Sequence, residues 1–170
     1  MELATGSLVC TGVCVGCLVY LHLAPTGYSP LRDAVSRYGV GAYARWYQAQ
    51  VAFCGVGAIL LAIALRRPTH VVVLLVAFGV ARIAITRFPM DTHLQAHWLL
   101  AVVTFVSVTT AAIRLEPAFH GTPALGFAML SALLAGIVLR RRPTSLFGAT
   151  ERAFYVAMLV WLVLVATRLV

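Results

Sequence analysis

The fold is decided by one uninterrupted apolar stretch, VVVLLVAF at residues 71–78. Its side chains do not alternate between apolar and polar, as they would in a strand of a membrane β-barrel. Backbone surrounded by hydrocarbon must satisfy its own hydrogen bonds, and within one continuous segment only a helix does so. The stretch therefore predicts a helix that spans a membrane.

The composition of the whole chain is that of an integral membrane protein. Apolar residues make up 62% of its 170 residues and charged residues only 11%, against about 45–50% and about 25% in soluble domains. Too few polar side chains are present to cover a surface that faces water. The net charge of +8 is expected beside anionic lipid headgroups. Nucleic acid is not an expected partner, because the sequence has no polar domain to carry a basic face.

Six apolar segments are each long enough to cross about 30 Å of hydrocarbon at about 1.5 Å per residue. They lie at about 6–24, 47–65, 70–88, 92–113, 122–139 and 151–170. The sequence thus predicts a single domain, residues 1–170, that is an all-α six-transmembrane-helix bundle. We expect a multi-pass protein of a cell membrane, and the exclusive use of arginine as the basic residue indicates a bacterial source with a GC-rich genome.

Small residues recur where helices can approach one another closely. Gly12 and Gly16 form a GxxxG step in the first segment. Gly55 and Gly57 lie in the second segment, and Gly126 in the fifth. These glycines predict contacts between helices.

Six spans place both termini on one side of the membrane, here called side A. The loops after the first, third and fifth spans then lie on side B. Side A carries Arg66, Arg67, Arg114 and Arg168. Side B carries Arg32, Arg37, Arg45, Arg87, Arg140, Arg141, Arg142 and Arg152. The positive-inside rule places side B in the cytoplasm, but arginines that belong to a site are not topology signals, so the orientation stays open.

The longest loop follows the first span and contains a short interfacial helix. Ser29-Pro30 is typical of an N-cap followed by proline in the first helical position, which predicts a helix from Pro30 to about Tyr38. Asp33, Ser36 and Arg37 then share one face. The segment is either an amphipathic loop on the headgroups or a lid over a pocket.

A second polar stretch, RFPMDTHLQAH at 87–97, links the third and fourth spans. Thr92 and Gln95 match a capping box, which predicts that the fourth helix begins at Thr92. His93 and His97 would then share a face, with Asp91 just ahead of them. These three side chains can present two imidazoles and a carboxylate to a divalent metal such as zinc. They lack the glutamate of H-E-x-x-H, and histidines that cap, hydrogen-bond and face water are the alternative.

Arg82 lies inside the third span, where a charge needs a partner or a wet cavity and indicates a functional site. The alternative is that its side chain extends to the headgroups. The available carboxylate partners are Asp33, Asp91 and Glu151. Glu151-Arg152 is expected to open the sixth helix after Thr150, where an acidic residue suits the helix dipole.

These polar residues predict one pocket at the side-B mouth of the bundle. The candidate residues are Asp33, Ser36, Arg37, Arg82, Arg87, Asp91, His97, Glu151 and Arg152.

Several of these stretches resemble the uncharacterised bacterial and archaeal membrane family known as domain of unknown function 998. The matching features are YSPLRDAVS at 28–36, RFPMD at 87–91, His97, Glu151-Arg152 and Trp161. The resemblance covers nearly the whole chain. It implies a six-helix membrane fold with Ser36, Asp91 and His97 as signature positions, and it supplies no established activity.

Two functions follow as hypotheses. In the first, the protein binds a membrane lipid or another small amphiphile in the side-B pocket, or serves as a companion subunit to a membrane-protein partner. In the second, it is a metal-dependent intramembrane lipid hydrolase in which Asp91, His93 and His97 hold the metal and activate water. Ser36 or Asp33 would assist, and Arg37 or Arg87 would hold an anionic headgroup. A transporter is less favoured because no inverted repeat is evident. The cofactor stays open between a divalent metal and haem, which His22 and His97 could ligate from the side-B ends of their spans.

Overall fold

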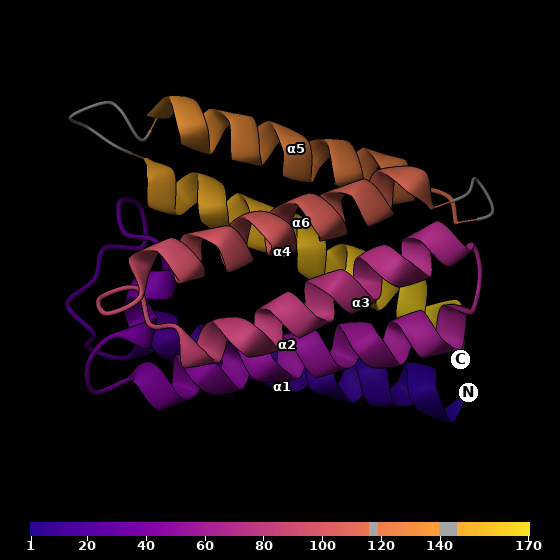
Figure 1. Ribbon diagram of the computed structural model, residues 1–170, viewed down its shortest axis with the longest axis horizontal. Coiled ribbons are helices and arrows are strands. Elements are labelled where there is room, and N and C mark those ends of the chain that lie inside the picture. The colour runs from indigo at the N-terminus through magenta and orange to yellow at the C-terminus, as the bar shows by residue number, and fades with distance from the viewer. Residues whose placement is uncertain (116–118, 140–145) are drawn as a thin grey trace.

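Six long helices account for most of the computed structural model, which describes residues 1–115, 119–139 and 146–170 (Figure 1). They are α1 (Glu2–Leu23), α2 (Ala44–Leu65), α3 (Thr69–Ala84), α4 (Leu94–Arg114), α5 (Thr122–Leu139) and α6 (Phe147–Thr167). Two short 3-10 helices are also present. η1 (Val35–Gly39) precedes α2, and η2 (Ile85–Arg87) continues α3. Five of the long helices, and α3 together with η2 (Thr69–Arg87), have the length and hydropathy to cross a membrane. The predicted six-helix membrane fold is confirmed.

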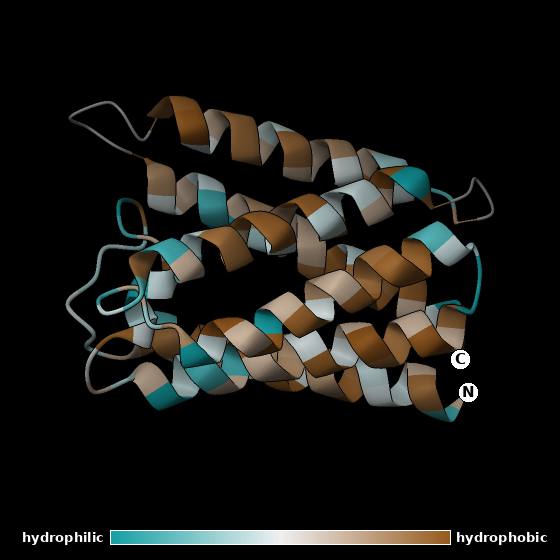
Figure 2. Cartoon of the chain, in the orientation of Figure 1, coloured by the Kyte–Doolittle hydropathy of each residue, from teal (hydrophilic) through white to brown (hydrophobic). Residues whose placement is uncertain are grey.

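The helices form a ring in which each packs against its neighbours in chain order and α6 closes against α1 (Figure 1). Both termini lie at the same end of the bundle, side A, and the loop between α1 and α2 lies at the opposite end, side B (Figure 1). Hydrophilic residues concentrate toward these two ends (Figure 2). Fully buried aromatic side chains, including Phe78, Phe154 and Trp161, fill the interior.

Two helix starts differ from the prediction. α4 begins at Leu94 and not at Thr92, because the amide groups of Thr92 and His93 both donate to the Pro89 carbonyl in a turn. The hydroxyl of Thr92 is bonded to His93 Nδ1 at 2.9 Å, so the predicted capping box is wrong. α6 begins at Phe147, which places Glu151 in its second turn and not at its start.

Glycines allow close helix contacts, although not at every predicted position. A Cβ atom on Gly79 would lie 2.6 Å from the Gly55 carbonyl oxygen, so α2 and α3 touch through these two glycines. Gly57 and Gly126 also lie against neighbouring helices. The prediction for Gly12 and Gly16 is wrong. Both are exposed, and a Cβ there would meet no atom of the described residues within 4 Å.

The loop between α1 and α2, residues 24–43, folds back onto the side-B end of the bundle, and we call it the cap segment. The predicted short helix is present as η1, but it starts at Val35 and not at Pro30. Ser29 and Asp33 instead close a turn, in which the Asp33 amide donates to the Ser29 carbonyl at 2.8 Å. Val35 and Tyr38 are buried, and η1 contacts both α2 and α6. This packing favours a lid over a loop that lies on the headgroups.

Candidate functional site

Arg152, from the second turn of α6, holds the cap segment in place. Its Nη1 donates to the Asp33 carbonyl at 2.8 Å, and its Nη2 donates to the Tyr38 hydroxyl at 3.2 Å. Its Nε donates to His22 Nε2 at 2.6 Å. Because His22 accepts there, its proton is on Nδ1, which donates to the Leu18 carbonyl at 2.7 Å. One guanidinium thus joins α1, α6 and the cap segment.

Two neighbours of Arg152 complete this attachment. Glu151 Oε2 accepts a hydrogen bond of 2.7 Å from the Val35 amide at the start of η1. Gly148, one turn earlier in α6, lies directly under the cap segment, and a Cβ at this position would be 2.6 Å from the Asp33 carbonyl oxygen. We call Gly148, Glu151 and Arg152 the cap anchor.

Beneath the cap segment, Arg82 lies at the centre of a hydrogen-bonded network between four helices. Its Nη1 donates to the Tyr155 hydroxyl on α6 at 2.8 Å, and its Nη2 donates to Gln50 Oε1 on α2 at 3.3 Å. Gln50 Nε2 in turn donates to Cys14 Sγ on α1 at 3.1 Å. Only 2% of Arg82 is exposed, so its side chain does not extend to the headgroups.

The charge of Arg82 has no carboxylate in contact with it within the described residues. The ion pair in the described residues joins Asp33 and Arg37 at 3.5 Å, on the exposed surface and not at Arg82. Glu151 is near enough to Arg82 for their charges to interact, but it forms no ion pair with it. The Arg82 Nε–H is buried and has no hydrogen-bond partner among the residues that the structure describes. An arginine in this state can donate a hydrogen bond to an additional anionic or carbonyl oxygen.

A small cavity lies between the cap segment and the start of α4. Its volume is about 10 Å³, about the size of one water molecule. Ser36 and His97 both line it, together with Gly39, Tyr47, Gln48, Ile85, Thr86, Pro89 and Met90. Tyr47 also interacts electrostatically with Arg82, so it connects the wall of this cavity to the network below.

The predicted site residues divide into four groups. Arg82, Glu151 and Arg152 belong to the network and the cap anchor described above. Ser36 and His97 line the cavity. Asp33 orders the cap segment, where its Oδ2 accepts from the Ser29 amide at 2.7 Å. Arg37, Arg87 and Asp91 are exposed at the rim of this face.

The predicted metal ligands do not come together. His97 is buried, and its Nδ1 lies 2.8 Å from the Phe88 carbonyl oxygen. His93 is exposed and packs edge-on against the Phe88 ring. No group of three metal-ligating side chains occurs among the residues that the structure describes. The metal-dependent hydrolase stays a prediction, to be tested by metal analysis of the purified protein.

Several residues of the network were missed by reasoning from the sequence. Gln50 is an isolated amide in an apolar span, and Tyr155 follows Glu151 by four residues, which places both on one face of α6. These two signals were present in the sequence. The contacts of His22 and Tyr38 with Arg152 could not be predicted, because they depend on how the cap segment folds. The predicted side-B arginines Arg140, Arg141 and Arg142 lie outside the described residues.

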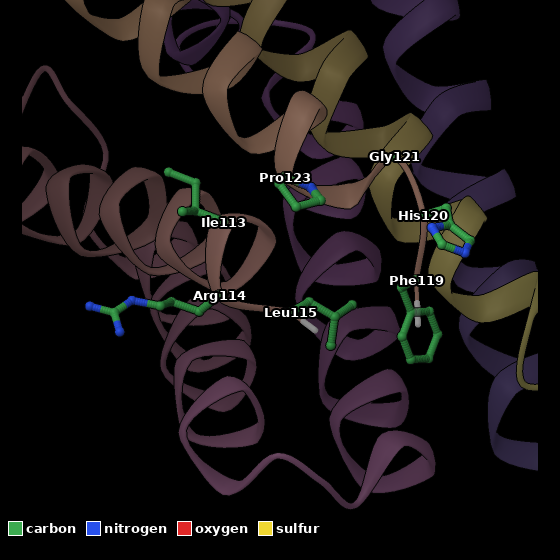
Figure 3. Close-up of a pocket in the computed structure, with 7 residues that line it drawn as sticks. All are labelled: Ile113, Arg114, Leu115, Phe119, His120, Gly121 and Pro123. Carbon is green, nitrogen blue, oxygen red and sulfur yellow. The ribbon is translucent and has the colours of Figure 1, made fainter. Parts of the chain in front are cut away.

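A larger hollow of about 450 Å³ lies at the opposite end of the bundle, where α4 leads into α5 (Figure 3). Leu115 and Phe119 contribute apolar walls, and the Arg114 side chain points away from them (Figure 3). His120 also lines it, and its carbonyl accepts from Arg168 at 3.0 Å. None of the predicted site residues lines this hollow.

Comparison with known proteins agrees with this architecture at the level of the family. No curated protein and no solved structure shows significant similarity to the chain. A family model described as protein of unknown function (DUF998) matches residues 8–168. Because this match covers nearly the whole chain, the protein is a polytopic membrane protein that belongs to the DUF998 family.

Proposed function

We propose that this protein binds an anionic amphiphile at side B, with the anionic group under the cap segment near Arg82 and the apolar chain along the helices. The observation that carries the proposal is the state of Arg82. It is buried, it contacts no carboxylate of the described residues, and its Nε–H has no hydrogen-bond acceptor among them, although the Cys54 thiol lies near enough to interact with the guanidinium. The common chemistry of the ligand is one carboxylate or phosphate group.

The charge balance beneath the cap segment supports an anionic ligand. Arg82 and Arg152 bring two positive charges, and Glu151 is the carboxylate near them in the described residues. The hydrogen-bond acceptors of both arginines are neutral. A buried charge without compensation is costly, and in a protein that must keep such a charge the compensation is expected to come from a ligand.

The rim of this face would assist capture of the same ligand. Arg37 and Arg87 are exposed there. Positive charges at a mouth with apolar walls raise the local concentration of anions. The cap segment would then exclude water from the bound group, which strengthens each charged contact.

The test is ligand binding to purified protein in a neutral detergent, measured by native mass spectrometry. Oleate and phosphatidic acid are compared, and phosphatidylcholine serves as the zwitterionic reference. We expect both anions, or one of them, to bind in preference to phosphatidylcholine. Arg82→Met should weaken that binding by about tenfold or more, because a charge-assisted hydrogen bond is lost. The relative affinities of oleate and phosphatidic acid then show whether the site prefers a carboxylate or a phosphate group.

The matched control is Arg45→Met, which removes the same charge from an exposed position on α2 at the same face. It should change affinity by about twofold at most, because an exposed charge is screened by solvent. Arg82→Lys retains the charge and tests whether a loss reflects electrostatics or misfolding. Equal affinities for anionic and zwitterionic lipids, or wild-type binding by a folded Arg82→Met variant, would contradict the proposal.

A further inference from the structure

We infer that Ser36 and His97 form a nucleophile and general base that cleave the acyl ester of an amphiphile, whose carboxylate product is the anion that binds near Arg82. This inference deepens the proposed function and rests on it for the fate of the product. The two residues come from different elements, η1 and α4, and both line the same cavity of about 10 Å³.

His97 has the environment that a general base requires. It is only 5% exposed, and its Nδ1 lies 2.8 Å from the Phe88 carbonyl oxygen. A carbonyl accepts hydrogen bonds and never donates them, so Nδ1 carries the proton. In the neutral ring, Nε2 is then left as a proton acceptor. A fixed tautomer whose Nε2 can accept a proton is the arrangement in which histidine removes a proton from a nucleophile.

The Ser36 hydroxyl donates to no strong hydrogen-bond acceptor among the described residues. Its Oγ donates to Met90 Sδ at 3.6 Å, and a thioether is a weak acceptor. The Met90 side chain also lines the cavity and has three rotatable bonds. A rotamer change at Met90 would therefore enlarge the cavity for a carbonyl group and free the Ser36 hydroxyl at the same time. Gln48, in the same wall, offers amide N–H groups to a developing oxyanion.

The reaction follows from these positions. Ser36 Oγ bonds to the ester carbonyl carbon while its proton passes to His97 Nε2. The bond from this carbon to the alcohol oxygen then breaks, and His97 returns the proton to the departing alcohol. Water next adds to the acyl carbon with loss of a proton to His97, and the Ser36 Oγ–carbon bond breaks with return of that proton to Oγ. The products are an alcohol and a carboxylic acid, which ionises to a carboxylate.

Tyr47 links this chemistry to the proposed binding site. It lines the cavity of Ser36 and His97, and it interacts electrostatically with Arg82. A carboxylate formed at Ser36 would therefore be produced beside a residue that interacts electrostatically with the guanidinium.

The test uses a fluorophosphonate probe, which bonds covalently to activated serine hydroxyls, on the full-length protein in detergent. We expect labelling of one residue, Ser36, identified by peptide mass spectrometry, and release of oleate from p-nitrophenyl oleate in micelles. Ser36→Ala should abolish both, and His97→Gln should slow both by about 100-fold or more. Met90→Ala, which removes the side chain that fills the cavity, should label at least as fast as the wild type.

Ser29→Ala is the matched control, because Ser29 lies in the same cap segment but does not line the cavity. It should label like the wild type, and circular dichroism checks that every variant keeps its helices. Absence of labelling in the folded wild type, or equal labelling of Ser36→Ala, overturns the inference. If oleate still binds in an Arg82-dependent way in either of these cases, the proposed function stands and only the catalytic pair fails.

Discussion

Arg152→Met should release the cap segment from the bundle. The change removes the hydrogen bonds that the guanidinium donates to Asp33, Tyr38 and His22. Hydrogen bonds of charged groups contribute about 1.5–3 kcal/mol each, and we expect the cap to lose about 3–4 kcal/mol in total because the neutral acceptors can then turn to water. At about 1.4 kcal/mol per factor of ten, the equilibrium for local opening shifts by about 100- to 1,000-fold.

Amide hydrogen exchange measures this opening directly. The informative amides are those of Val35, Arg37 and Val40, which donate to Glu151, to Ala34 and to Arg37. Their exchange should accelerate in Arg152→Met, while amides in the middle of α2 and α6 keep their protection. Arg37→Met is the control, since its 3.5 Å ion pair with Asp33 is exposed and such pairs contribute about 0–1 kcal/mol. Equal exchange rates in both variants would show that Arg152 does not hold the cap.

Gly148→Ala should displace the cap segment from below. A Cβ at this position would lie 2.6 Å from the Asp33 carbonyl oxygen and 2.7 Å from the Pro30 carbonyl oxygen. Backbone atoms cannot rotate away as side chains can, so the cap has to lift. Overpacking of this kind costs about 1–3 kcal/mol, which exceeds the gain of about 1 kcal/mol that alanine brings to a helix. We expect a lower melting temperature and weaker binding of anionic amphiphiles.

The control for this change is Gly16→Ala. This glycine lies in α1, and a Cβ there would meet no described atom within 4 Å. The same substitution should therefore leave the melting temperature unchanged or raise it. If Gly148→Ala and Gly16→Ala behave alike, the close contact between α6 and the cap segment does not contribute to stability.

The fold could be predicted from the sequence because lipid imposes strict requirements on it. A stretch such as residues 71–78 has one way to satisfy its backbone in hydrocarbon, and proline and arginine end most of the spans. The helix starts at side B were less predictable. Thr92 and Gln95 match a capping box, yet Pro89 organises the turn there. The starts of α4 and α6 are therefore set by tertiary contacts, which local motifs do not encode.

The candidate site could be predicted in composition but not in connectivity. Sequence spacing brought Asp33, Arg37 and Ser36 to one face, and the Asp33–Arg37 ion pair is present. It did not show that Arg152 would bond to the cap segment, because that contact joins positions 119 residues apart. For Arg82 the sequence offered three carboxylates as partners. The partners are Tyr155 and Gln50, which are neutral side chains that an analysis of charges overlooks.

If an anionic group binds beneath the cap segment because of the charge of Arg82, that group should also hold the cap closed. The most direct measurement is hydrogen exchange of the Val35, Arg37 and Val40 amides in lipid nanodiscs, with phosphatidylcholine alone or with added oleate or phosphatidic acid. We expect an anionic amphiphile to slow exchange in the wild type and to have no effect in Arg82→Met. Equal exchange with and without the anion in the wild type, or equal slowing in both proteins, would contradict this expectation.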